Sequence, residues 1–107
     1  APEGEPEVFV ISSGGSGIPV YRRLQKEHIP FAAGILYEND MDYQLARLLA
    51  AKVITEEPFE EIREETLQRA FETMEKCKRV INAGVQIGTW NQAIRRLLDK
   101  AEEKGKL

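Results

Sequence analysis

The sequence predicts an α/β domain, a Rossmann-like three-layer sandwich in which a four-stranded parallel sheet carries helices on both faces. Its length of 107 residues suits one domain with a single core. Short apolar, β-branched runs alternate with segments whose apolar residues recur at intervals of three and four. Strands that alternate with helices require right-handed crossovers and a parallel sheet, and we expect the strand order 3-2-1-4.

The domain is expected to span residues 8–107. Residues 1–7 mix proline, glycine and glutamate without an apolar period, which is typical of a linker. The chain also begins without methionine. A piece of a longer protein is therefore expected, although terminal processing explains the missing methionine equally well.

The first half of the chain predicts two strand-helix units. Residues 8–11 form a continuous apolar run, followed at once by a glycine-rich turn. Pro19 suits a first helical turn, and the next apolar residues share one face of a helix that ends before His28. Residues 31–36 predict the second strand, and a second helix follows, with apolar residues in helical spacing at Met41, Leu45, Leu48 and Leu49.

The second half repeats the pattern. Residues 52–55 predict a short third strand, and an apolar stripe from Leu67 to Cys77 predicts a helix with a charged outer face. Residues 79–83 predict the fourth strand. Thr89 and Gln92 match a capping box for the last helix, whose apolar residues are Ile94, Leu97, Leu98 and Ala101.

A binding site is expected at the carboxyl ends of the first and fourth strands. In this strand order the connections leave these strands toward opposite faces of the sheet, which opens a crevice. Glycine lets the backbone approach a ligand, and a turn that opens a helix directs free amides at an anion. The residues expected to line the crevice are Ser13, Gly14, Gly15, Ser16, Gly17, Tyr37, Glu38, Asp40, Gly84, Ile87, Gly88, Trp90 and Asn91.

Several of these assignments have a structural alternative. The glycines suit a tight turn between a strand and a helix, and Asn39 or Asp40 suits a helix cap. Asp42 adds a further polar group near the crevice. Trp90 continues the apolar stripe of the last helix, so burial and ligand contact are both open for it.

The glycine turn matches nucleotide-binding motifs only in part. No Gly-Lys-Ser/Thr follows it, which excludes a P-loop. Gly15 and Gly17 begin a dinucleotide fingerprint, and Glu38 stands about where the ribose-binding acid belongs, but Val20 occupies the third glycine position. A nucleotide-cofactor domain is therefore one alternative.

Nothing in the sequence predicts catalysis or a metal site. His28 ends a helix, Cys77 belongs to an apolar stripe, and no Ser-His-acid, Cys-His or paired-carboxylate arrangement can be assembled near the turn. The net charge of −3 offers no basic field for nucleic acid. No apolar run approaches the roughly 18 to 20 residues of a membrane helix.

Three groups of residues carry a resemblance to an accessory module of ABC transporters. They are Ser13 to Gly17, then Ala33-Gly34-Ile35-Leu36 leading to Asp40 and Asp42, and then Gly84 with Ile87, Gly88 and Asn91. With them, residues 8–101 resemble the C-terminal extension of ATP-binding subunits of the cobalamin and iron-siderophore importer type. The Walker and signature motifs of the ATPase itself are absent.

The resemblance implies a noncatalytic regulatory or ligand-sensing domain. It implies an ABC ATPase domain in the same parent chain, indirect contact with transporter membrane subunits, and a cytoplasmic position at the inner face of the membrane. A corrinoid such as cobalamin, or an iron-siderophore, is the implied ligand, and a corrinoid would bind without the Asp-x-His-x-x-Gly motif. A dimerisation or docking module without a ligand is the other alternative, with a homodimer as its simplest form.

Overall fold

The computed structural model describes residues 4–12, 16–34, 41–54, 62–83 and 92–107. Strands and helices alternate along these residues from β1 to α4. In chain order they are β1 (Val8–Ser12), α1 (Ile18–Lys26), β2 (Phe31–Gly34), α2 (Met41–Leu49), β3 (Lys52–Val53), α3 (Glu64–Lys76), β4 (Arg79–Ala83) and α4 (Gln92–Glu103).

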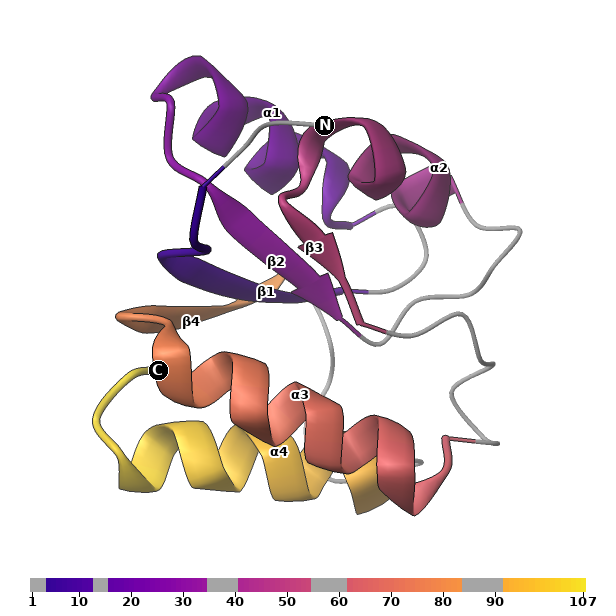
Figure 1. Ribbon diagram of the computed structural model, residues 1–107, viewed down its shortest axis with the longest axis vertical. Helices are drawn as coiled ribbons and strands as arrows, with labels where there is room; N and C mark the ends of the chain where they lie inside the picture. Colours follow the sequence, from indigo (N-terminus) through magenta and orange to yellow (C-terminus); the bar gives the residue numbers. More distant parts are fainter. Residues whose placement is uncertain (1–3, 13–15, 35–40, 55–61, 84–91) are drawn as a thin grey trace.

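The strands form one parallel sheet in the order β3-β2-β1-β4, with β1 between β2 and β4. Helices α1 and α2 cover one face of this sheet, and α3 and α4 cover the other (Figure 1). The predicted α/β class, strand order and three-layer arrangement are therefore confirmed.

Strand β1 is the centre of the core because both faces of the sheet are covered by helices. All five of its residues are buried. Phe9 and Ile11 pack with α3 and α4, whereas Val8 and Val10 pack with α1 and α2, as expected when successive side chains of a strand point to opposite faces. The continuous apolar run therefore reflects burial on both faces.

Gly34 fits the packing of strand β2 against β1. A Cβ atom at this position would lie 2.6 Å from Cζ of Phe9, which is shorter than any allowed contact. The Phe9 ring therefore occupies the space that a side chain at position 34 would need. This contact accounts for a glycine inside an otherwise apolar strand.

The bounds of the elements differ slightly from the sequence prediction. β1 continues to Ser12, α1 begins at Ile18, and β3 contains only Lys52 and Val53 of the expected residues 52–55. Residues 35–36 of the expected second strand lie outside the described residues, as do Thr55 and the capping residue Thr89. Strand ends are set by pairing with neighbours rather than by local composition, so such shifts are expected.

Helix α2 forms where the apolar spacing predicted it, but it does not bury the whole apolar pattern. Its buried residues are Asp42, Tyr43 and Ala46, whereas Met41 is 73% and Leu48 is 67% exposed. An aspartate thus takes a position on the buried face while two large apolar side chains face outward.

Candidate functional site

Two of the predicted site residues, Ser16 and Gly17, lie within the described part of the chain. The others fall outside it: Ser13, Gly14, Gly15, Tyr37, Glu38, Asp40, Gly84, Ile87, Gly88, Trp90 and Asn91. The described residues next to these segments include the ends of β1 and β4 and the starts of α1 and α2.

Strands β1 and β4 end side by side. Ser12 is the register partner of Ala83, and these residues are the last of the two strands. After β1 the chain continues to α1 on one face of the sheet, and after β4 it continues to α4 on the other (Figure 1). The predicted topological switch between the first and fourth strands is therefore present, and the two glycine-containing segments leave neighbouring strand ends.

A buried carboxylate meets the start of α1 at this edge. The backbone N–H of Gly17, the N-cap residue of α1, donates a hydrogen bond of 2.9 Å to Oδ2 of Asp42. The Asp42 side chain is fully buried and lies in the first turn of α2. Its carboxyl group therefore lies near the positive ends of two helix dipoles, which favour the charged form.

Position 17 suits glycine because the neighbouring side chains leave no room for a Cβ atom. A Cβ atom would lie 2.6 Å from Oγ of Ser12 and 2.8 Å from Oδ2 of Asp42. The φ angle of Gly17 is −79°, so positive φ is not the reason. The architectural interpretation of the turn is thus supported at this position.

A second buried polar contact adjoins the first. The hydroxyl groups of Ser12 and Tyr21 form a hydrogen bond of 2.6 Å between Oγ and Oη, and both side chains are fully buried. The Tyr21 ring stacks on Phe31, with 5.2 Å between ring centroids. The hydrogen bond satisfies a hydroxyl group that burial alone would make costly.

We call Ser12, Gly17, Tyr21 and Asp42 the edge cluster. Sequence reasoning placed Asp42 near the crevice, but it assigned Tyr21 only to a helical face and did not expect the Ser12–Tyr21 hydrogen bond. The only sequence feature that indicated a place for Ser12 at the strand end was its position directly after the apolar run. Nothing in the sequence links Asp42 to an amide 25 positions earlier.

The edge cluster changes the expected electrostatics of the glycine turn. The turn was expected to direct free amides at an anionic ligand, but the Gly17 amide already binds an internal carboxylate. A phosphate placed there would find this amide already bonded to a carboxyl oxygen of the protein. The start of α1 therefore suits a neutral or cationic ligand group better than a phosphate.

The other reactive side chains lie away from this edge. Cys77 follows the end of α3 and is buried, and burial raises the pKa of its thiol to about 11, so it stays protonated at neutral pH. His28 is exposed beyond the end of α1. Within the described residues, no three His, Cys, Asp or Glu side chains are grouped to hold a metal ion.

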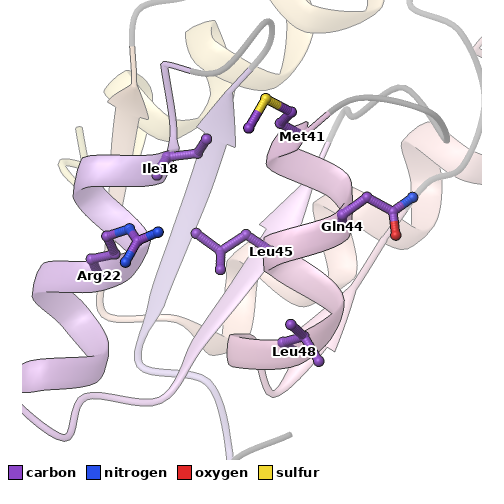
Figure 2. Close-up of a pocket in the computed structure, with 6 residues that line it drawn as sticks. All are labelled: Ile18, Arg22, Met41, Gln44, Leu45 and Leu48. Carbon is purple, nitrogen blue, oxygen red and sulfur yellow. The ribbon is translucent and has the colours of Figure 1, made fainter.

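A groove of about 240 Å³ lies between α1 and α2 on the outside of the molecule. Figure 2 shows Arg22 of α1 and Leu45 of α2 pointing toward each other across it. Its lining is mostly apolar and includes the two exposed apolar side chains of α2, Met41 and Leu48. The lining residues are Ile18 and Arg22 of α1, and Met41, Gln44, Leu45 and Leu48 of α2. We call this the α1–α2 groove.

No helix in the described part of the chain has the length and apolarity needed to cross a membrane.

Comparison with known proteins connects the chain to one family. The model of the MJ0874 family matches residues 31–107, from β2 to the end of the chain. The chain is also similar to the uncharacterized protein MJ0874 of Methanocaldococcus jannaschii, with 31% identity over 68 residues, which cover 64% of this chain and 73% of that protein. No solved structure matches.

Proposed function

The chain belongs to the MJ0874 family, and we propose that it is a noncatalytic domain that binds a small molecule at the carboxyl edge of its sheet. In this proposal it regulates an ABC importer for a corrinoid or an iron-siderophore. It is then joined to an ABC ATPase domain in the same parent chain, lies in the cytoplasm at the inner face of the membrane, and contacts the membrane subunits indirectly.

The observation that carries the proposal is the switch point between β1 and β4. Ligands of open α/β sheets bind outside the carboxyl ends of the strands at such a point. Here the edge cluster holds the start of α1 rigidly against β1 and α2 through two buried hydrogen bonds. An edge held by buried hydrogen bonds favours recognition of a ligand without chemistry.

The charge at the edge favours one kind of ligand. Because Asp42 already occupies the Gly17 amide, a ligand whose contacts there are neutral or cationic fits better than one that presents a phosphate. The corrin ring of cobalamin carries neutral amide side chains, so in this proposal the ring, and not the phosphodiester of its nucleotide loop, faces the start of α1. The resemblance to the importer extension remains the basis for naming this ligand class.

Titration of the purified domain tests the proposal. We expect cobalamin or a ferric siderophore to raise the melting temperature, because a ligand at 100 times its dissociation constant stabilises a protein by about 2.7 kcal/mol. Isothermal titration calorimetry gives the affinity. The absence of binding to either ligand class would remove the sensor function.

A pair of matched variants locates the site. Ser16 is exposed beside the edge cluster, whereas Gln25 is exposed near the other end of α1. Ser16→Arg is expected to weaken binding by about tenfold or more through bulk and charge. Gln25→Arg adds the same side chain far from the edge cluster and is expected to leave binding unchanged. Equal affinity of the two variants would place the ligand elsewhere.

The nucleotide-cofactor alternative keeps its own test. It requires the pyrophosphate near the start of α1, and the Asp42 carboxylate counts against that placement. Saturating NAD or NADP is therefore expected to leave the melting temperature unchanged. A clear rise with either nucleotide would support this alternative instead.

The α1–α2 groove favours a second candidate function, which is formation of a homodimer. Met41 and Leu48 are exposed on one face of α2, two helical turns apart. When two α2 helices pack antiparallel about a two-fold axis, each Met41 meets Leu48 of the second copy. Such a self-complementary pattern is what a symmetric dimer requires.

Measurement of mass in solution separates this candidate from the first. Sedimentation or light scattering is expected to give a dimer for the original chain and a monomer for Leu48→Glu, because a charge would be buried at the interface. Gln68→Glu adds the same charge at an exposed position of α3 and is expected to leave the dimer intact. A concentration-independent monomer in the original chain would refute this candidate.

A further inference from the structure

A second concave site lies between α1 and the edge strand β4. Its volume is about 190 Å³. Six residues line it: Val20, Arg23 and Leu24 of α1, its C-cap residue Glu27, and Arg79 and Ile81 of β4. We call it the α1–β4 pocket. It is smaller than the roughly 300 to 1,000 Å³ of pockets for drug-sized ligands, so it suits a small metabolite.

The topology of the sheet creates this pocket. β4 is an edge strand, and its helices α3 and α4 lie on the opposite face from α1 (Figure 1). Ile81 therefore lies on the α1 side beside Val20 and Leu24, and no helix in the described part of the chain lies directly above β4 on this face. Leu24 is buried, whereas Val20 and Ile81 remain partly exposed. The floor of the pocket is thus apolar and partly accessible to solvent.

Charged groups surround that apolar floor. Arg23 and Arg79 come from different elements and both line the pocket, and within the described residues neither guanidinium has an ion-pair partner. Glu27 lines the same pocket one helical turn after Arg23. The chain as a whole carries a net charge of −3, so two arginines at one concavity are a local feature rather than part of a general basic surface.

We propose that the α1–β4 pocket binds a small zwitterion with an apolar side chain, for which an aliphatic α-amino acid is the simplest example. Its carboxylate pairs with the guanidinium groups of Arg23 and Arg79, a geometry that arginine suits particularly well. Its ammonium group faces the Glu27 carboxylate. Its side chain covers Val20, Leu24 and Ile81, which removes their remaining apolar surface from water.

This site is independent of the proposed site at the carboxyl edge. Arg79 is the first residue of β4, and Glu27 caps the end of α1, so both charged groups lie toward the amino ends of the strands. Binding of an amino acid and binding of a corrinoid are therefore separate events. Either proposal can fail while the other stands.

Calorimetric titration of the chain with L-leucine and three analogues tests the assignment. 4-Methylpentanoate lacks the ammonium group, 3-methylbutylamine lacks the carboxylate, and glycine lacks the apolar side chain. We expect leucine to bind and each analogue to bind at least about tenfold more weakly, because each loses one set of contacts. No binding of leucine, or equal binding of an analogue, would overturn the zwitterion assignment.

Two variants connect the binding to these residues. Arg79→Ala is expected to lower the affinity for leucine by about tenfold or more, whereas Arg69→Ala, an exposed arginine on α3 at the opposite face, is expected to leave it unchanged. Glu27→Gln is expected to remove the preference for leucine over 4-methylpentanoate. Melting temperatures of the unliganded variants distinguish loss of binding from loss of folding, and unchanged affinities in both folded pocket variants would refute the site.

Discussion

At the scale of single residues, helices α1 and α4 end in the same backbone motif, but a histidine occupies its left-handed position after α1 and a glycine occupies it after α4. After α1, the N–H of His28 donates to the carbonyl of Gln25, and the N–H of Ile29 donates to that of Leu24. After α4, Gly105 and Lys106 donate to Glu102 and Ala101 in the same way. Both are Schellman motifs, whose central residue adopts a left-handed conformation. His28 has φ 58° and Gly105 has φ 69°.

His28→Gly is therefore expected to stabilise the domain. Sequence reasoning placed His28 at the end of a helix, which is confirmed, but its distinguishing feature is a backbone conformation that costs a side-chain-bearing residue about 1 kcal/mol. We expect a gain of about 0.5 to 1 kcal/mol in the free energy of unfolding from denaturant titration. Gly105→Ala, the reverse change at the matching position, is expected to lose about 1 kcal/mol. A loss of stability in His28→Gly would contradict this account.

Gly17→Ala is expected to destabilise the domain and disturb the edge cluster. The new Cβ would lie 2.6 Å from Oγ of Ser12, so the Ser12 or Asp42 side chain must move. Overpacking of this kind costs about 1 to 3 kcal/mol, which urea denaturation measures. The exposed substitution Gln25→Ala in the same helix provides the control. If Gly17→Ala were as stable as the original chain, the close packing described at this turn would be wrong.

At the scale of elements, the C-terminal end of helix α3 is bound by a lysine that follows α4, in addition to the hydrogen bond from the N–H of its C-cap residue Cys77 to the carbonyl of Met74. The Lys106 ammonium group donates hydrogen bonds of 2.9 to 3.0 Å to the carbonyls of Met74, Glu75 and Cys77, at the end of α3. The carbonyl of Lys106 accepts a bond of 2.8 Å from the N–H of Val80 in β4. A positive charge is favourable at a helix C-terminus, where the last carbonyls lack partners from a following helical turn.

Lys106→Met is expected to lower the free energy of unfolding by about 1 to 2 kcal/mol. Methionine keeps most of the aliphatic length but removes the ammonium group and its bonds to the end of α3. Lys26→Met removes a charge from an exposed position in the last turn of α1 and is expected to change stability by less than about 0.5 kcal/mol. Thermal and denaturant unfolding compare the two variants. Equal stability of both variants would show that the contacts of Lys106 contribute nothing measurable.

At the scale of the whole molecule, the fold was predictable because it depends on features repeated along the chain. Alternating strand and helix patterns, together with right-handed crossovers, leave few arrangements, and the order 3-2-1-4 is among them. The features that define the candidate sites depend instead on tertiary contacts. The Gly17–Asp42 bond joins residues 25 positions apart, and the α1–β4 pocket joins Arg23 to Arg79. Helical spacing also did not indicate which side of α2 would face outward, because both sides carry apolar residues.

The two helical layers are expected to unfold together, because β1 lies buried between them. Phe9 and Ile11 belong to the core on one face of the sheet, and Val8 and Val10 to the core on the other. Leu24→Ala on the α1 side and Leu97→Ala on the α4 side, both at buried positions, are each expected to cost about 2 to 5 kcal/mol. Leu107→Ala, at an exposed position outside the helices, serves as the control.

Two spectroscopic probes measure whether the layers are coupled. Circular dichroism follows all helices, whereas the fluorescence of the single tryptophan, Trp90, reports only on the surroundings of that residue. We expect the two urea transitions to coincide in each variant, since a shared central strand links the layers into one cooperative unit. If the circular dichroism and fluorescence transitions of Leu24→Ala had different midpoints, the domain would not unfold as one cooperative unit. In that case β1 would not couple the two cores.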